Sequence, residues 1–376
     1  MKNLLFYGTT PYAIKISSSD FNKFNELSKT FNTFVYSSNK NPRYIDHKVV
    51  KIFYIKKFNN FLINYFYFYF FNIFSFYKFV KKENIDIVSA KDPIAALIPT
   101  ILLKFRLANF KLVIEHHGDF LNLLMNQRKV YLKKFTIFLS KLISNFTYKN
   151  CDLIRGVHEE QTAILERKFN KKTSVFPAWV DYKTFYPKNN NTGLNNVLFV
   201  GNIIPRKGVL FLLKSFNIFQ KTSKHLYNFM IIGDTPNIKY FKECQNLITQ
   251  NNIKNVKFYG PMNPDEIAKK MNESDLLVMA SNFEGLPRVL IESGLCKLPS
   301  LATNIEGIAT PFNSKGGTIL YENNNEEEFI KNLELFFNNL QLQADLAVRA
   351  HQLSNSLSGS GVFGNNWKKI ADKLYE

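Results

Sequence analysis

The sequence predicts an α/β protein with two doubly wound domains, each a parallel sheet covered by helices on both faces. The chain has 376 residues, which is enough for two hydrophobic cores at about 150 residues per domain. Its residues are 45% hydrophobic and 21% charged, the composition of a globular protein. Short apolar runs alternate with longer helical segments along both halves, and this alternation is typical of parallel sheets.

The predicted strands are short runs rich in β-branched or aromatic residues, each ending in a turn signal. In the first half they are residues 3–7, 33–36, 49–55, 85–89, 111–115, 153–157 and 174–176. In the second half they are residues 197–200, 229–232, 256–259, 276–279, 300–302 and 318–321. Because doubly wound sheets bind ligands beyond the carboxyl ends of their strands, we expect functional residues directly after these runs.

A polar, breaker-rich stretch at residues 186–196 predicts an interdomain linker. We therefore expect an N-terminal domain of residues 1–187, a C-terminal domain of residues 188–355 and a terminal segment of residues 356–376. The net charge of +19 is unevenly divided: residues 1–180 hold 28 basic and 12 acidic residues, whereas residues 181–376 hold 21 and 18. This asymmetry predicts an anionic partner for the first half, either a membrane surface, a nucleic acid or a phosphorylated substrate.

The cysteines and the N-terminus indicate where the protein works. Cys151, Cys244 and Cys296 are scattered and form no C-x-x-C pair, so we expect neither a disulfide framework nor a zinc knuckle, and a reducing compartment. The apolar run at residues 4–7 is too short for the core of a signal peptide, so we expect no export by that route.

Residues 61–80 are almost entirely apolar and aromatic over the length that a bilayer span requires. On a helix, the polar residues Asn60, Asn64, Ser75, Lys78 and Lys82 would share one narrow stripe. The stripe favours a buried helix that flanks the sheet, with a membrane-docking helix and a transmembrane helix as alternatives.

The most specific segment follows the predicted strand at 276–279 and carries Glu284 and Glu292. Ser281 and Asn282 can cap a helix, and a proline suits its first position, so we predict a helix that begins at residue 287 or 288. The free amides and the dipole of the helix start then lie between the two carboxylates. This arrangement fits a sugar, a diphosphate and a ribose in line.

A glycine turn with two adjacent cations follows the predicted strand at 197–200: Gly201 and Asn202, then Arg206, Lys207 and Gly208. Arginine offers a forked donor and lysine a compact charge, so this loop is predicted to bind phosphate.

Histidines end another predicted strand, at 111–115. His116 and His117, two of only six histidines, run into a glycine turn with Asp119, where an α/β cleft would open. Asp92 follows the strand at 85–89, and Gly8 lies in the loop after the first strand.

The segment from Glu284 to Glu292 resembles the E-x7-E motif of the retaining GT-B glycosyltransferases of family 4, in the branch that builds bacterial surface polysaccharides. The resemblance runs from about residue 85 to residue 376. It implies a GT-B architecture, with two Rossmann-like domains facing each other across a cleft and a C-terminal helix crossing back to the first domain.

The resemblance also implies roles. Glu284 would position the donor sugar, Glu292 would bind the ribose, Lys207 would contact the diphosphate, and His117 would contact the sugar and phosphate. Family members usually carry an arginine where this chain has Asn202, and we expect Arg206 to supply that charge. The other donor-binding residues implied are Gly201, Gly285, Leu286, Pro287, Arg288, Val289 and Met262, and those on the acceptor side are Asp119, Asp92 and Gly8.

The motifs that the sequence lacks argue against several kinds of site and enzyme. The sequence has no D-x-D segment and no cluster with metal-ligand spacing, so we expect neither a metal nor a cofactor. The diphosphate charge would then be met by Arg206, Lys207 and helix amides. The sequence also lacks a Walker loop and a G-x-S-x-G elbow, which argues against an NTPase or a hydrolase.

We therefore expect a cytoplasmic glycosyltransferase, peripheral on the inner face of the membrane. It would move a sugar from a nucleotide-sugar donor to a hydroxyl of a glycan or lipid-linked acceptor, with retention of anomeric configuration and without a specific nucleic-acid partner. The alternatives are a GT-B nucleotide-sugar epimerase, a basic nucleic-acid-binding protein for which no recognition motif is present, and a two-domain solute-binding protein for which no export signal is present.

Overall fold

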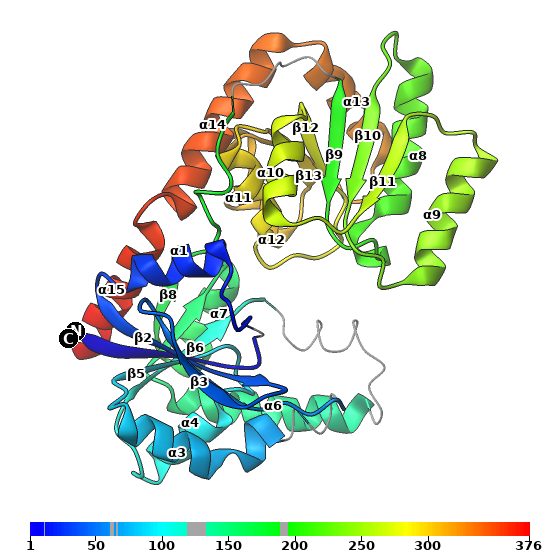
Figure 1. The fold of residues 1–376 in the computed structure, drawn as a ribbon. Helices are drawn as coiled ribbons and strands as arrows, with labels where there is room; N and C mark the ends of the chain where they lie inside the picture. The colour runs from blue at the N-terminus through cyan, green and yellow to red at the C-terminus, as the bar shows by residue number, and fades with distance from the viewer. Residues whose placement is uncertain (11, 61–63, 65–66, 119–132, 189–194) are drawn as a thin grey trace. The chain divides into compact units, whose positions relative to one another are not determined.

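The computed structural model describes residues 1–376 apart from 11, 61–63, 65–66, 119–132 and 189–194 (Figure 1). The chain divides into two compact units. The N-terminal unit comprises Met1–Trp179 and Gly361–Glu376, and the C-terminal unit comprises Val180–Ser360. Each unit is built on one largely parallel sheet, so the α/β class predicted from the alternating apolar runs is confirmed.

The sheet of the N-terminal unit has eight strands in the order β3-β4-β2-β1-β5-β6-β7-β8. All neighbouring strands are parallel except β3 and β4. The strands are β1 (Lys2–Tyr7), β2 (Phe31–Asn39), β3 (Arg43–Asp46), β4 (Lys51–Lys56), β5 (Ile87–Ala90), β6 (Lys111–His116), β7 (Leu153–Gly156) and β8 (Lys172–Val175). The helices are α1 (Ser18–Leu27), α3 (Ile73–Lys82), α4 (Leu97–Lys104), α6 (Lys133–Asn150), α7 (Glu159–Phe169) and α15 (Val362–Tyr375).

Alternate residues of β1 enter two cores on opposite faces of this sheet. Leu5 and Tyr7 pack into the core that includes α3 and α4, and Leu4 and Phe6 pack into the core that includes α1 and α15. Trp367 of α15 is fully buried there, with its ring 5.2 Å from that of Phe6. The period-two pattern of a strand therefore places one layer of helices on each face.

The apolar stretch at residues 61–80 is not one continuous helix. A π-helical turn covers Tyr67–Phe71 and α3 begins at Ile73, with the buried Asn72 between them. The interruption has a polar cause, because the Asn72 amide donates to the hydroxyl of Tyr36 at 2.8 Å. The predicted polar stripe is also divided, since Asn64 is buried whereas Lys78 and Lys82 are exposed. Among the helices of the described residues, none has the length and apolar character needed to cross a membrane.

The sheet of the C-terminal unit has six parallel strands in the order β11-β10-β9-β12-β13-β14. They are β9 (Asn196–Val200), β10 (Asn228–Ile232), β11 (Val256–Gly260), β12 (Leu276–Met279), β13 (Ser300–Thr303) and β14 (Thr318–Tyr321). The α-helices are α8 (Val209–Thr222), α9 (Ile238–Gln250), α10 (Pro264–Asn272), α11 (Arg288–Leu295), α12 (Glu306–Ala309), α13 (Glu326–Phe337) and α14 (Leu340–Ser358).

Candidate functional site

The C-terminal sheet changes winding direction between β9 and β12. These two strands are neighbours, but the chain builds outward from β9 through β10 and β11 on one side, and from β12 through β13 and β14 on the other. Ligands of doubly wound sheets bind at such a switch point, beyond the carboxyl ends of the strands. The loops that leave β9 and β12 there are the two that the sequence singles out.

Close backbone approaches hold these two loops together. The Asn282 amide donates to the carbonyl of Arg206 at 2.9 Å. Gly208 has φ 67°, and a Cβ atom there would lie 2.2 Å from the Ala280 carbonyl oxygen. Gly307 packs equally tightly, since its Cβ atom would lie 2.2 Å from the carbonyl oxygens of Glu284 and residue 285. Glycine is therefore required at both positions, for steric reasons at each and for backbone conformation at Gly208.

This packing brings together three of the predicted residues: Glu284, Lys207 and Arg206. Lys207 Nζ is 2.5 Å from Glu284 Oε1, and Arg206 Nη1 is 3.2 Å from the same oxygen. Only 10% of the Glu284 side chain is exposed. Burial favours the neutral acid, but Lys207 and Arg206 outweigh it and hold the pKa of Glu284 below its ordinary value. The loop thus fixes an ionised carboxylate against two cations.

Helix α11 begins at Arg288, in agreement with the predicted start at 287 or 288. The expected capping by Ser281 or Asn282 is wrong: the cap is Pro287, which has no capping side chain, because Asn282 is tied to the other loop six residues before the helix. The amides of Arg288 and Val289, in the first turn, therefore have no acceptor within the helix.

Glu292 lies in the second turn of α11. Its carboxylate is largely buried, with Oε1 3.3 Å from the guanidinium of Arg288, which is 54% exposed. Burial raises the pKa of Glu292, and Arg288 only partly opposes this effect. Glu284 and Glu292 thus differ in environment, because the first is held as an anion by two cations and the second is held by one exposed arginine.

The other predicted donor-side residues also lie beyond the carboxyl ends of the strands of this sheet. Gly201 and Asn202 directly follow β9, and Asn202 is exposed. Gly285 and Leu286 belong to the loop that precedes α11. Met262 lies two residues beyond β11, at the edge of the sheet. Arg206, expected to compensate for Asn202, contacts Glu284 and donates to the carbonyl of Phe283 at 2.5 Å.

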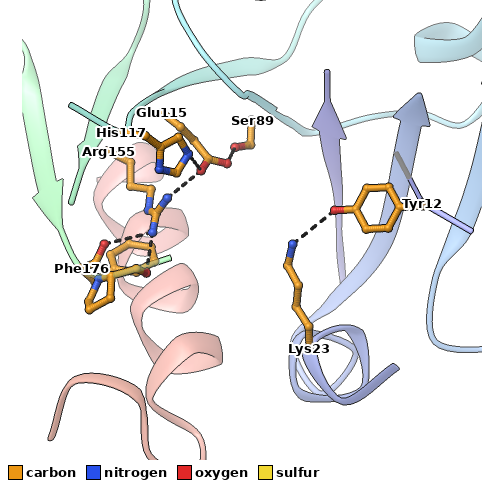
Figure 2. A network of polar contacts seen from close by, with 8 residues as sticks. Tyr12, Lys23, Ser89, Glu115, His117, Arg155 and Phe176 are labelled. Carbon is orange, nitrogen blue, oxygen red and sulfur yellow. Dashed lines mark hydrogen bonds and ion pairs between the residues drawn. The ribbon is translucent and has the colours of Figure 1, made fainter. Parts of the chain in front are cut away.

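In the N-terminal unit, His117 follows β6 and belongs to a polar network (Figure 2). Its Nε2 lies 2.9 Å from Glu115 Oε2, and its side chain is 38% exposed. Glu115 also accepts hydrogen bonds from Arg155 at 2.6 Å and from Ser89 at 2.7 Å. Burial opposes ionisation of Glu115, but Arg155, His117 and Ser89 outweigh it, so its pKa lies well below the usual range.

The predicted acceptor-side residues occupy different kinds of position. Asp92 accepts a hydrogen bond from the Ala95 amide at 2.7 Å, so its carboxylate stabilises the turn that leads into α4, and burial raises its pKa. Gly8 packs against Lys91, whose Cβ atom would be 2.8 Å from a Cβ atom at residue 8. Asp119 lies outside the described residues.

Sequence reasoning missed Glu115, Arg155 and Ser89. A signal for Arg155 was available, because a charged residue in the middle of the apolar run 153–157 requires a buried partner. Its partner stands directly across the β6–β7 ladder, where Glu115 pairs with Arg155 in the parallel register. Register cannot be read from either strand alone, so the pair becomes visible only in the folded sheet.

Two family descriptions together match most of the chain. "Glycosyltransferase Family 4" matches residues 26–184, and "Glycosyl transferases group 1" matches residues 183–353. An uncharacterized glycosyltransferase of Methanocaldococcus jannaschii is 25% identical over 351 residues, which are 92% of this chain and 89% of that protein. The UDP-Gal:alpha-D-GlcNAc-diphosphoundecaprenol alpha-1,3-galactosyltransferase of Escherichia coli is 26% identical over 287 residues, 70% of this chain and 69% of that protein.

The solved structure of sucrose-phosphate synthase from Thermosynechococcus elongatus has a TM-score of 0.80 to this chain at 14% identity, and it covers 100% of this chain and 99% of that one. At this identity the likeness concerns the fold alone. It confirms the predicted GT-B fold of two Rossmann-like units.

Proposed function

This chain belongs to glycosyltransferase family 4, and we propose that it transfers a sugar from a nucleotide-sugar donor to an acceptor hydroxyl with retention of anomeric configuration. The observation that supports this proposal most is the buried Glu284 carboxylate, which Lys207 and Arg206 contact beside the start of α11. Cations and free helix amides suit a diphosphate, and a fixed carboxylate suits sugar hydroxyls.

The proposed reaction breaks the bond between the anomeric carbon and the diphosphate through an oxocarbenium-like state. Lys207, Arg206 and the first amides of α11 stabilise the charge that develops on the leaving phosphate, so no metal is required. Glu284 positions the sugar and Glu292 binds the ribose. By analogy with the family, His117 contacts the donor, and the departing phosphate oxygen takes the proton of the acceptor on the same face.

For the substrates, we propose a UDP-hexose donor and a lipid-linked glycan acceptor. This choice is supported by the Escherichia coli relative, whose name specifies UDP-Gal and a diphosphoundecaprenol-linked acceptor. A lipid-linked acceptor would bring the N-terminal unit, with its excess of basic residues, to an anionic membrane surface.

Glu292→Ala tests this function. UDP and UDP-hexoses should raise the melting temperature of the wild-type protein, because a ligand bound only by the native state stabilises it. The variant should bind UDP about 10-fold to 100-fold more weakly, as expected for lost hydrogen bonds to a charged group. Since burial opposes ionisation of Glu292, removing this carboxylate should not lower the stability of the free protein. Calorimetric titration with UDP measures the affinity.

The matched control is Glu273→Ala, which removes an acidic residue paired with Lys270 at 2.7 Å on the surface of the same unit. This control should bind UDP like the wild type. Equal UDP affinity in all three proteins would refute the assignment of Glu292. An isomerised sugar nucleotide formed without any acceptor would instead favour an epimerase.

We propose that the outer face of the segment formed by the π-helical turn Tyr67–Phe71 and α3 docks on an anionic bilayer. Phe71 and Phe74 are 72% and 77% exposed, and Lys78, Lys81 and Lys82 are exposed along α3. Phe76 and Phe79 of the same segment are buried, so one face packs on the sheet while the other offers aromatic rings beside lysines. Rings insert at the lipid interface, and each lysine adds about 1 kcal/mol near anionic lipid.

The double substitution Phe71→Ser/Phe74→Ser should weaken binding to vesicles of mixed phosphatidylglycerol and phosphatidylethanolamine about 10-fold or more, since each buried phenylalanine contributes about 1.5–3 kcal/mol. Vesicle co-sedimentation at constant salt measures this loss. The double substitution Leu226→Ser/Leu340→Ser removes two equally exposed apolar residues from the C-terminal unit, 75% and 77% exposed, and should leave binding unchanged. Equal losses in the two variants, or no loss in either, would contradict the proposed docking face.

A further inference from the structure

The carboxylate of Glu115 contacts one ring nitrogen of His117. Glu115 Oε2 contacts both His117 Nε2 and an Nη1 atom of Arg155, while Oε1 accepts from the hydroxyl of Ser89 (Figure 2). These side chains come from the ends of three adjacent strands, β5, β6 and β7. In the part of the chain that the structure describes, the side chains that contact the carboxylate are donors, and this arrangement stabilises the anion.

The position of Arg155 makes this arrangement rigid. Its side chain is only 2% exposed, and its second terminal nitrogen donates to the carbonyls of Phe176 and Pro177 at 2.9 Å and 2.6 Å. Its guanidinium also lies 4.2 Å from the centre of the Phe176 ring. Because Arg155 is fixed beside it, Glu115 stays ionised. An ionised Oε2 has no hydrogen to donate, so it can only accept a hydrogen bond from His117.

An ionised carboxylate accepts hydrogen bonds and donates none, so His117 Nε2 must carry the hydrogen. In a neutral imidazole only one nitrogen is protonated, which leaves Nδ1 with a free lone pair. Among the described residues, Nδ1 has no hydrogen-bond partner, and the ring is 38% exposed. The neutral ring therefore presents an acceptor outward.

We propose that Glu115 is a positioning residue that fixes His117 in the Nε2–H tautomer, so that Nδ1 accepts a hydrogen bond from a hydroxyl of the donor sugar. This inference rests on the proposed function, because it assigns a chemical role to a histidine that the function places at the donor. It also separates two kinds of contact. In its neutral form this ring has no hydrogen on Nδ1 to donate to a phosphate oxygen, so in that form its partner on the donor is a sugar hydroxyl.

The tautomer can be measured without substrate. In protein labelled with ¹⁵N-histidine and kept at a pH where the ring is neutral, two-bond ¹H–¹⁵N correlations distinguish the protonated from the unprotonated nitrogen. The His117 signals are assigned by their absence in His117→Gln. We expect His117 to show a protonated Nε2 and an unprotonated Nδ1, without a detectable share of the other tautomer. A protonated Nδ1 in the wild type would overturn the proposal.

The variant that removes the restraint is Glu115→Leu/Arg155→Met, which replaces the whole buried ion pair by apolar side chains and so avoids an unpaired charge. Its His117 signals should move toward the average of two exchanging tautomers. The matched control, Lys111→Met/Asp152→Leu, removes the ion pair between Lys111 of β6 and Asp152, the residue before β7. This pair is 3.4 Å long and partly exposed, and its removal should leave these signals unchanged. An unaltered tautomer in the first variant would also overturn the proposal.

Activity supplies the second measurement. With a UDP-sugar that the wild type uses, kcat/KM of the Glu115→Leu/Arg155→Met variant should fall about 10-fold to 100-fold, as when a histidine loses the partner that orients its ring, while the control keeps its activity. Full activity together with a mixed tautomer would refute the proposed role of Glu115 and would leave the proposed function of the protein standing. If the wild type transfers no sugar, the proposed function fails, and the tautomer measurement still decides how Glu115 acts on His117.

Discussion

Replacing Arg155 with methionine should lower the free energy of unfolding of the N-terminal unit by about 3–5 kcal/mol, the range for removal of one partner of a buried ion pair. The substitution leaves Glu115 buried without its counter-ion, and it deprives the carbonyls of Phe176 and Pro177 of a donor. Because the protein has two units, hydrogen exchange of the amides in β6 and β7 reports this loss better than a single global melting temperature.

Two comparisons separate this effect from ordinary surface electrostatics. Lys111→Met removes the ion pair between β6 and Asp152, the residue before β7, with side chains 39% and 31% exposed, and should cost about 1 kcal/mol or less. Adding Glu115→Leu to Arg155→Met should recover part of the lost stability, because the pair is then replaced by apolar groups. A cost equal to that of Lys111→Met would show that the buried pair contributes no more than an exposed one.

The loss of stability caused by Arg155→Met should also depend on pH. In the wild type, the pKa of Glu115 lies well below its ordinary value, so its contribution to stability is present above the unfolded-state pKa and is lost as the pH falls toward the folded-state pKa. Without Arg155, burial favours the neutral acid. The difference in stability between wild type and variant should therefore be largest near neutral pH and should shrink on acidification.

The strands could be predicted from sequence because their signal is local. A run such as 276–279 has only apolar residues between turn signals, and the structure has β12 at the same residues. The strand that was missed, β3, has two charged residues among its four, lacks a continuous apolar run and is largely exposed. It forms by antiparallel pairing with β4 at the sheet edge, so its cause lies in a neighbouring strand and not in its own sequence.

The candidate site divides in the same way. Glu284 and Lys207 each follow a strand in the sequence, and this position could be predicted. Glu284 and Lys207 are 77 residues apart in the sequence. Their side chains meet because β9 and β12 are neighbours in the sheet. The break at Asn72 has a similar origin, because its partner Tyr36 comes from β2. Sequence patterns therefore identify residue types at strand ends, and the order of strands decides which of them meet.

Lys207→Met should lower kcat about 100-fold to 1000-fold, the range for removal of one group that stabilises transition-state charge. Lys207 Nζ has three hydrogens and uses one on Glu284 Oε1 at 2.5 Å. The other two can serve phosphate oxygens while Glu284 stays in place. The variant therefore loses a cation at the leaving group and one of the two cations that hold Glu284 ionised. Steady-state kinetics with a UDP-sugar that the wild type uses measure this loss.

The matched control is Lys214→Met, which removes an exposed lysine from α8 in the same unit and should leave kcat unchanged. A variant Lys207→Met with more than half of the wild-type kcat would exclude Lys207 from the reaction. The pH dependence is informative as well: because Lys207 helps to hold the pKa of Glu284 low, its removal should move the acid limb of the kcat profile to higher pH.

Combining Lys207→Met with Glu284→Gln decides whether the pair acts as one unit. If Lys207 acted on phosphate and Glu284 on sugar independently, the losses of the two single variants would multiply in the double variant. The direct contact between the two side chains predicts instead that the double variant is little worse than the poorer single one, because removing either partner already disturbs the other. Arg206, which reaches the same Glu284 oxygen at 3.2 Å, should then account for much of the binding of the diphosphate that remains.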